Sequence, residues 1–300
     1  MSSQPHSADY FGDTRDHWWN RDFLQLMSQR WELHAVKRVL DVGCGIGHWS
    51  RCLTPFLSAD CALTGVDREP QSLEEARKRS TSIHHLTTTF LEADAARLPF
   101  PDASFDMVTC QTVLIHVNDP VAVLREMIRV LTPGGLIALA EPNNAASNLS
   151  PIDPEKPIRE TLDLLEFQMI CERGKRILGE GYNSAGPLIP GWLSDLGVRQ
   201  IASYLSDKTT MLLPPHTSEH ARATIQEMDD RDRREFWFWN REDTHRYFLA
   251  GGGSTDAFAT SWGKALAHER SLLDSVPRMH RSITHVPVLL LVSGRKAPSG

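Results

Sequence analysis

Short apolar segments alternate with amphipathic segments along the first half of the chain. The apolar segments are rich in Val, Ile and Leu, and the segments between them place apolar residues three or four positions apart, as a helix with one buried face does. We therefore expect strands at 39–42, 61–67, 87–92, 105–110 and 136–140, and helices at 46–57, 71–80 and 119–131. Strands that alternate with helices form a mainly parallel sheet.

One segment, Val-Leu-Asp-Val-Gly-Cys-Gly-Ile-Gly at 39–47, carries the clearest chemical signal. A strand ends there and turns tightly into a helix, with glycines where the backbone needs positive φ or a ligand comes close. Dinucleotide sites use G-x-G-x-x-G, with a pyrophosphate at the helix N-terminus. Here the spacing is G-x-G-x-G, and Asp41 precedes the first glycine. This carboxylate would repel a pyrophosphate and attract an ammonium or sulfonium group, which argues against a nicotinamide dehydrogenase.

The segment resembles motif I of the class I S-adenosylmethionine (SAM)-dependent methyltransferases. Two further segments resemble the same family: D-A-A-R-L-P-F at 94–100 and R-V-L-T-P-G-G at 129–135. The style of these motifs is similar to that of the ubiquinone/menaquinone-biosynthesis type, which methylates oxygen, nitrogen and carbon acceptors. The resemblance covers residues 35–145 in detail. It implies SAM as cofactor, S-adenosylhomocysteine as product, and no metal.

The cofactor residues follow from the resemblance and from their places at strand ends. Ligands of open α/β sheets bind at the carboxyl ends of the strands, and an acid at the end of the second strand can accept both ribose hydroxyls. In the family, the acid of the third loop and the next backbone N–H contact adenine, and the N-terminal segment often closes as a lid. The expected cofactor residues are Asp41, Gly43, Cys44, Gly45, Gly47, Asp67, Arg68, Asp94, Ala95, Gln111, Tyr10 and Trp18.

The remaining chain completes the expected fold. Helical patterns occur at 15–32 and 159–178, and the segments 193–198, 199–204 and 287–294 resemble the family's last helix, sixth strand and antiparallel closing strand. We predict a doubly wound α/β fold with a mainly parallel seven-stranded sheet and an antiparallel last strand. The expected parts are an N-terminal lid segment and helix (1–34), a SAM-binding Rossmann-like core (35–205), a helical insertion (206–285) and a closing strand with its tail (286–300).

The insertion at 206–285 is longer than a hairpin between two strands needs. It contains Phe-Trp-Phe-Trp at 236–239, a Gly251–Gly253 break and a helical pattern at 256–273. It is a candidate for a cap over the substrate, for a dimer surface or for additional core. We favour the cap, because substrate choice on a shared fold is commonly made by such additions.

Methyl transfer from a sulfonium is an in-line displacement, so the protein mostly supplies alignment. His116, in the loop after the fourth strand, is the candidate general base, since an imidazole exchanges protons near neutral pH. The alternative is a loop histidine bonded to backbone. Glu141 and Asn143 follow the fifth strand and could position the substrate, or Glu141 could anchor the site from behind. His216 and His220 lack an obvious third ligand, so no metal is expected.

Composition limits the possible partners and compartment. The formal charge of −6 argues against broad binding of nucleic acid, and Arg231, Arg233 and Arg234 are interleaved with aspartates. The five cysteines form no C-x-x-C pair, which favours a reduced setting. With no signal-peptide pattern and no long apolar run, we expect a cytoplasmic protein that acts on a small molecule without a membrane. A protein or tRNA acceptor, or SAM binding without turnover, are the alternatives.

Overall fold

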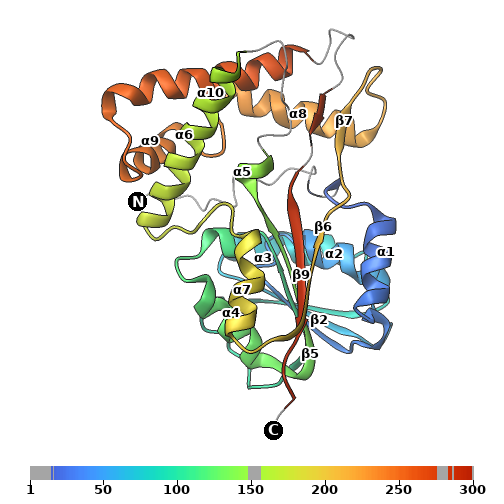
Figure 1. Cartoon of the computed structure of the whole chain (residues 1–300). Coiled ribbons are helices and arrows are strands. Elements are labelled where there is room, and N and C mark those ends of the chain that lie inside the picture. Colours follow the sequence, from blue (N-terminus) through green and yellow to red (C-terminus); the bar gives the residue numbers. More distant parts are fainter. Residues whose placement is uncertain (1–14, 16, 148–156, 276–282, 286, 299–300) are drawn as a thin grey trace.

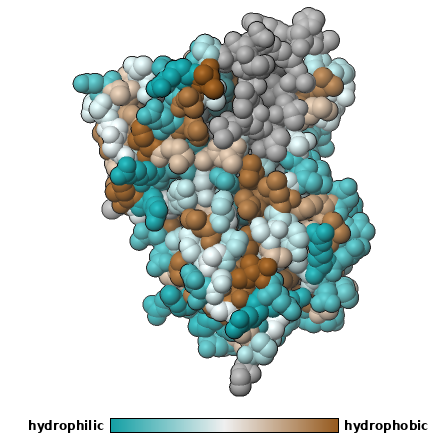
Figure 2. All heavy atoms as spheres, viewed as in Figure 1, coloured by the Kyte–Doolittle hydropathy of each residue, from teal (hydrophilic) through white to brown (hydrophobic). Residues whose placement is uncertain are grey.

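The computed structural model describes residues 15, 17–147, 157–275, 283–285 and 287–298. It consists of an α/β layer and a helical layer stacked on one end of it (Figure 1). Hydrophilic and hydrophobic residues are mixed over both layers on the face shown in Figure 2. Among the described helices, none combines the length and the apolar composition that a bilayer crossing requires.

The α/β layer contains the predicted seven-stranded sheet. Its strands are β1 (Arg38–Val42), β2 (Ala62–Asp67), β3 (Thr87–Glu92), β4 (Phe105–Gln111), β5 (Leu131–Pro142), β6 (Arg199–Leu205) and β9 (Leu289–Arg295). Their spatial order is β3-β2-β1-β4-β5-β9-β6. The first five strands pair in parallel, whereas β9 pairs antiparallel with both β5 and β6. The order reverses at β1 and β4, which is where such sheets bind ligands.

Helices cover both faces of this sheet, because successive strand residues point to opposite sides. Val39 packs in one buried cluster with α1 (Arg21–Arg30) and α2 (His48–Leu53). Leu40 packs in the other with α4 (Pro120–Val130) and α7 (Ile189–Asp195). Helix α3 (Pro70–Ser80) packs against β2 and β3. The core therefore has the two-sided cover that a parallel sheet needs.

Three predicted boundaries differ from the structure. Helix α1 begins only at Arg21, and the helix expected at 46–57 is divided into α2 and a 3₁₀ turn at Thr54–Phe56. The residues 132–135 lie within β5 as an irregularity, since Phe105 pairs with Leu131 and Met107 with Leu136. Backbone bonds from Gly134 N to Lys296 O and from Lys296 N to Gly135 O hold this segment in the sheet.

The helical layer, called the cap below, has a core of its own. It comprises α6 (Ile158–Ile177), α8 (Glu219–Arg233), α9 (Arg241–Ala250), α10 (Thr255–Ser275) and the hairpin of β7 (Thr210–Leu212) and β8 (Ile283–His285). Its buried cluster contains Phe167, Trp237, Trp239, Tyr247 and Phe248. The aromatic run at 236–239 is thus largely cap core. Helix α6 was expected within the 35–205 core but packs against α9 and α10 instead, so two separate chain segments build the cap.

Two glycines bring α6 and α9 into close contact. A Cβ on Gly174 would lie 1.7 Å from the Tyr247 carbonyl oxygen, and one on Gly251 would lie 1.9 Å from the Ile170 carbonyl oxygen. Both obstacles are backbone atoms, which cannot rotate away. The helices can approach this closely only without side chains at these positions.

We therefore expect Gly174→Ala to lower the free energy of unfolding by about 2–3 kcal/mol, as overpacking of a close contact does. Gly263→Ala in α10 is the matched control, because no described residue has an atom within 4 Å of its Cβ position. That change should raise the free energy of unfolding by up to about 1 kcal/mol through helix propensity. Urea denaturation of both variants measures the difference, and equal effects would contradict the close packing.

Candidate functional site

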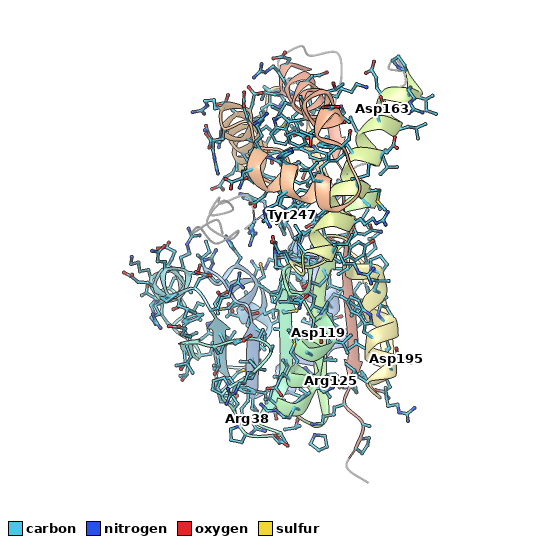
Figure 3. The ribbon with its side chains drawn as sticks, turned by 90° about the vertical axis from the view of Figure 1, so that its left-hand side faces the viewer. Arg38, Asp119, Arg125, Asp163, Asp195 and Tyr247 are labelled. Carbon is cyan, nitrogen blue, oxygen red and sulfur yellow. The ribbon has the colours of Figure 1, made fainter. Side chains whose placement is uncertain are left out.

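The carboxyl ends of the parallel strands face the cap. Arg38, the first residue of β1, lies at the end of the sheet far from the cap, whereas Tyr247 lies where the cap meets the α/β layer (Figure 3). The Tyr247 hydroxyl donates to Glu180 Oε2 at 2.6 Å, and Arg246 also binds this carboxylate. The predicted site residues at the ends of β1 to β4 therefore lie on the side of the sheet that the cap covers.

The loop after β1 has the conformation that its glycines require. Gly43, Gly45 and Gly47 have φ values of 65°, 51° and 81°. A Cβ on Gly43 would lie 2.5 Å from Val113 Cγ2, so this glycine permits close packing against the β4 loop. No atom of the described residues lies within 4 Å of the Cβ position of Gly45, so this stretch of backbone is not covered by a described side chain. Cys44, in contrast, is buried against Leu73, Ala76 and Phe90.

Asp41 lies buried beneath this loop. Its Oδ2 accepts a hydrogen bond from Ser50 Oγ, while Oδ1 has no hydrogen-bond partner among the described residues. Burial raises the pKa of Asp41 to about 7, and the nearby Asp67 carboxylate adds to this effect. Asp41 is therefore a desolvated carboxyl group with one oxygen available for a hydrogen-bond donor.

Asp67, at the end of β2, ties two strand ends together. Its Oδ2 accepts a hydrogen bond from Gly45 N at 2.8 Å, and its Oδ1 accepts one from Glu69 N at 3.0 Å. Its own carbonyl oxygen accepts from Ala93 N, directly before Asp94. Arg68 is exposed and pairs with Glu69. The acids 41, 67 and 94 thus follow three adjacent strands, which are spaced about 4.8 Å apart.

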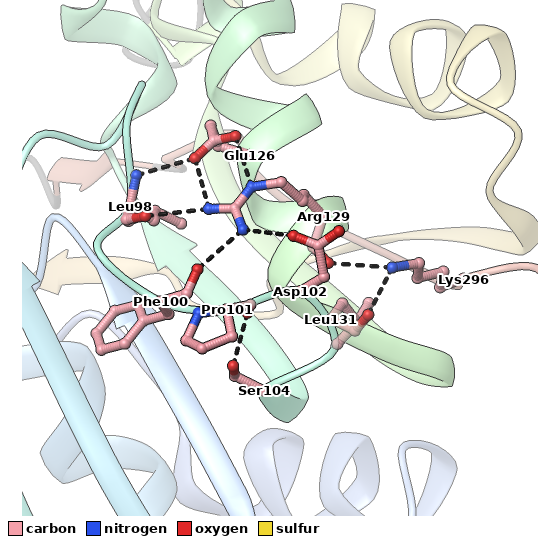
Figure 4. Close-up of polar contacts among 9 residues, drawn as sticks. All are labelled: Leu98, Phe100, Pro101, Asp102, Ser104, Glu126, Arg129, Leu131 and Lys296. Carbon is pink, nitrogen blue, oxygen red and sulfur yellow. Dashed lines mark hydrogen bonds and ion pairs between the residues drawn. The ribbon is translucent and has the colours of Figure 1, made fainter.

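The loop that carries Asp94 is held by α4 (Figure 4). Arg129 donates to the carbonyl oxygens of Leu98 and Phe100, and Glu126 accepts from Leu98 N. Asp94 is exposed, and its Oδ1 accepts a hydrogen bond from Ala96 N at 2.9 Å. Arg129 and Glu126 also bind each other, and these contacts raise the pKa of Arg129 and lower that of Glu126. The loop is therefore fixed by a charged pair, while Asp94 remains accessible.

The loop after β4 is bound from two sides. Glu141 is buried below it, and its Oε1 accepts hydrogen bonds from Val113 N at 2.7 Å and Leu114 N at 2.9 Å. Burial raises the pKa of Glu141 to about 7. From the cap, the buried Lys175 donates to Ile115 O at 2.9 Å, and burial lowers its pKa to about 8. Glu141 therefore has the anchoring position that the sequence left open as an alternative.

The aromatic residues of the N-terminal segment have different roles. Trp19 is buried, contacts Trp49 and donates its indole N–H to Gln111 Oε1 at 3.3 Å. Gln111 therefore holds this tryptophan in place. Trp18 is partly buried and faces a cavity between the layers. Tyr10, the other expected lid residue, lies outside the described residues.

The cavity between the α/β layer and the cap has a volume of about 400 Å³. His116 and Thr112 line it from the β4 loop, and Thr112 has a φ of 54°, unusual for a residue with a β-branched side chain. Asn144 also lines it, whereas the expected substrate residues Glu141 and Asn143 are not among its described lining residues. Asn143 Oδ1 instead accepts from Ala146 N, as a cap of the short helix α5 (Asn144–Ser147).

Sequence inspection missed the contribution of the cap to this site. Lys175 belongs to a helix that is remote in sequence from the β4 loop, and no motif surrounds it. Glu172 and Gln168, one turn apart on the same helix, are also buried and bind each other. Polar residues at 168, 172 and 175 follow a helical spacing, but this spacing alone does not show that they face inward. Among the described residues, no group of three His, Cys, Asp or Glu side chains could hold a metal ion.

Comparison with known proteins agrees with this geometry. A family model described as a methyltransferase domain matches residues 40–139. A demethylmenaquinone methyltransferase of Deinococcus radiodurans is 42% identical over 116 residues, which cover 39% of this chain and 47% of that protein. One of Staphylococcus aureus is 30% identical over 152 residues, covering 51% of this chain and 57% of that protein. The chain thus spans about half the length of the curated relatives it matches.

Solved structures share the fold. The YcgJ protein from Bacillus subtilis has a TM-score of 0.51 and 22% identity, covering 93% of this chain and 100% of that chain. A protein of Bacillus halodurans has a TM-score of 0.51 and 18% identity, with the same coverage. The family match therefore identifies residues 40–139 as a methyltransferase domain, and the two solved structures show that the chain shares their fold.

Proposed function

We propose that this chain is a SAM-dependent methyltransferase that transfers the methyl group of SAM to an oxygen, nitrogen or carbon nucleophile of a small molecule. One observation carries the proposal: the bare Gly45 backbone and the three strand-end acids lie on the cap side of the sheet. The cavity lined by His116 and Thr112 lies on the same side. The second product is S-adenosylhomocysteine.

The residues at the strand ends fit SAM chemically. The Oδ1 atom of Asp41 is buried without a partner, and an ammonium group would supply the missing donor. Asp67 would accept the ribose hydroxyls, and Asp94 with Ala95 N–H would hold the adenine edge. Gly43, Gly45 and Gly47 would admit the ligand close to the backbone, with Cys44, Arg68, Gln111, Trp18 and Tyr10 around it. When bound, SAM supplies a methyl group already activated by its sulfonium.

The acceptor belongs in the cavity between the layers. A volume of about 400 Å³ lies in the usual range for small-molecule sites, which supports a small-molecule acceptor. Only Thr112, Ile115 and His116 of its described lining residues fall within the matched segment 40–139. The substrate of the curated relatives therefore does not carry over by itself, because the N-terminal segment and the cap form most of the lining.

His116 would act as the general base for an acceptor that must lose a proton. It ends the 3₁₀ turn Leu114–His116, lines the cavity and follows Ile115, whose carbonyl oxygen Lys175 binds. Glu141 and Lys175 would position this turn rather than touch the acceptor. The expected partner is a small molecule, without nucleic acid or membrane, in the cytoplasm.

Replacing Asp67 tests cofactor binding. Asp67→Ala removes the acceptors of both ribose hydroxyls and the tie to Gly45 N, so the Kd for SAM should rise about tenfold or more. Isothermal titration calorimetry measures this constant. Asp60→Ala, at an exposed carboxylate paired with Lys37 outside the site, should leave it unchanged. Unaltered affinity in Asp67→Ala would remove Asp67 from the site, and absence of saturable SAM binding by the unmodified protein would contradict the proposal.

Replacing His116 tests the base. His116→Ala should slow methyl transfer by roughly 10²–10⁴-fold while leaving the Kd for SAM unchanged, because a general base acts on the acceptor. Tritium from labelled SAM is followed into the small-molecule fraction of a cell extract. The exposed His34 supplies the control His34→Ala. If His116→Ala retained full turnover, His116 would be a packing residue of the loop and not a general base.

The pH dependence of stability tests the buried acid. Asp41 keeps its proton up to about pH 7 in the folded chain but releases it near its usual value of 3.8 when unfolded. Between these values the folded state binds more protons, so its stability falls as pH rises. The free energy of unfolding of Asp41→Asn relative to the unmodified protein should therefore rise between pH 5 and 7, by on the order of 2 kcal/mol.

The control for this experiment has the opposite sign. Lys37 lowers the pKa of Asp60, so the stability of Asp60→Asn relative to the unmodified protein should fall slightly as pH rises through the acid range. Urea denaturation at several pH values, without added SAM, measures both differences. A flat difference for Asp41→Asn would show that this carboxylate is charged and paired in the folded chain.

A further inference from the structure

The charge of the cavity lining differs from that of the chain. The chain has a formal charge of −6. The described lining residues of the cavity nevertheless include three Lys or Arg and four His side chains, against two Glu. A cavity whose lining is more basic than the surrounding protein selects for negative charge in its ligand.

Three of these basic side chains lie near one another in the cavity lining. The rings of His17 and His220 stack with their centroids 5.3 Å apart. Burial lowers the pKa of His220, and the nearby Lys208 and His17 add to this effect. His17 comes from the N-terminal segment, Lys208 from the start of the β7 hairpin and His220 from α8. We call these three residues the basic cluster. Arg15, 5.2 Å from the ring centroid of Trp18, also lines the cavity.

The described hydrogen-bond partners of the cluster are neutral side chains. Lys208 Nζ donates to the neutral Asn20 Oδ1 at 3.2 Å, and His220 Nε2 lies 3.3 Å from Thr210 Oγ1. Within the described part of the chain, no ion pair joins an acid to the three members. Asp207 is exposed and accepts from Asn20 Nδ2. Glu227 is seven residues beyond His220 on α8, about 10 Å along the helix axis.

The rest of the cavity suits an apolar body. Trp18, Trp237, Phe238, Trp239, Met228 and Leu164 line it. The basic cluster is also tied to the transfer site through a short segment, because Trp19, two residues after His17, donates to Gln111 at the end of β4. The cluster, these apolar side chains and His116 thus line one and the same cavity.

From this arrangement, and resting on the proposed function, we infer that the methyl acceptor is an anion. It has an apolar or aromatic body and a carboxylate or phosphate group that binds His17, Lys208 and His220. A charge-assisted hydrogen bond from lysine recognises either group, and imidazole N–H groups add neutral hydrogen bonds. The anionic group would fix the orientation of the acceptor, while its nucleophile lies beside His116. All three cluster residues lie outside segment 40–139, so this preference would be specific to chains with this cap and N-terminal segment.

The test uses three probes with one body: 1-naphthoate, 1-naphthyl phosphate and the neutral 1-naphthalenemethanol. Their Kd values are measured by calorimetry on the full chain in the presence of saturating SAM. We expect at least one anionic probe to bind about tenfold or more tightly than the neutral probe. Comparing the Kd values of 1-naphthoate and 1-naphthyl phosphate shows whether the site prefers a carboxylate or a phosphate. Equal affinity of all three probes, or binding by none, would overturn the inference.

Variants show whether the preference comes from the cluster. Lys208→Met and His220→Gln should each reduce affinity for the preferred anion about tenfold, while affinity for the neutral probe stays within twofold. Retained neutral binding also shows that each variant is folded. Lys78→Met is the matched control, since Lys78 is exposed on α3 and pairs with Glu74. Anion preference that survives both cluster variants would place the anion elsewhere and overturn the assignment.

The two proposals fail separately. SAM binding and the probe titrations are independent measurements, and the probe titrations can be repeated without SAM. If the anions bind through the cluster but SAM does not bind, the anion site stands and the methyltransferase function falls. If SAM binds and methyl transfer occurs without any preference for anions, only the inference about the acceptor falls.

Discussion

The loop after β4 depends on two buried charged groups that hold it from opposite sides. Glu141, at the end of β5, accepts hydrogen bonds from two successive backbone N–H groups of the loop. Lys175, from the cap helix α6, donates to the Ile115 carbonyl oxygen of the same loop. Each group satisfies backbone atoms that the sheet and the helices leave unpaired. The loop therefore joins the two layers, and it carries His116 at their boundary.

Burial destabilises the charged form of each of these groups, and different contacts oppose this effect in each case. Glu141 is fully buried, and its pKa of about 7 reflects desolvation that the two backbone N–H groups only partly oppose. Lys175 has a lowered pKa for the same reason, with Glu172 and Glu180 opposing the shift. Asp41 has only Ser50 as a partner for one oxygen. The first two groups stabilise the fold by binding backbone, whereas one oxygen of Asp41 has no hydrogen-bond partner among the described residues.

The two layers contribute different parts of the proposed site. The α/β layer carries the glycine loop and the acids 41, 67 and 94, and this is the part that matches the methyltransferase domain family. The cap and the N-terminal segment form most of the cavity lining. A shared cofactor site with a separately built acceptor site is a common way for one fold to serve many substrates. A relative that matches only the α/β layer therefore says more about the proposed cofactor than about the proposed acceptor.

The sequence by itself determined the sheet and the strand-end motifs. Strand and helix periods are local, and the glycine spacing with Asp41 and Asp67 lies within two consecutive strand–loop units. The mainly parallel seven-stranded sheet, its antiparallel last strand and the methyltransferase family were accordingly predicted correctly. Element boundaries such as the start of α1 and the irregular segment 132–135 were less accurate, because contacts with Lys296 and other remote residues decide them.

Only the tertiary structure decided the cap and the cavity. The sequence assigned α6 to the α/β core, but its glycine contact with α9 places it in the cap. The pairing of Lys175 with Ile115 O and the meeting of His17, Lys208 and His220 join residues from separate segments. No local pattern encodes such meetings, since they follow from how whole helices pack. The glycine and acid motifs are therefore local features of the sequence, whereas the lining of the cavity depends on how distant segments pack together.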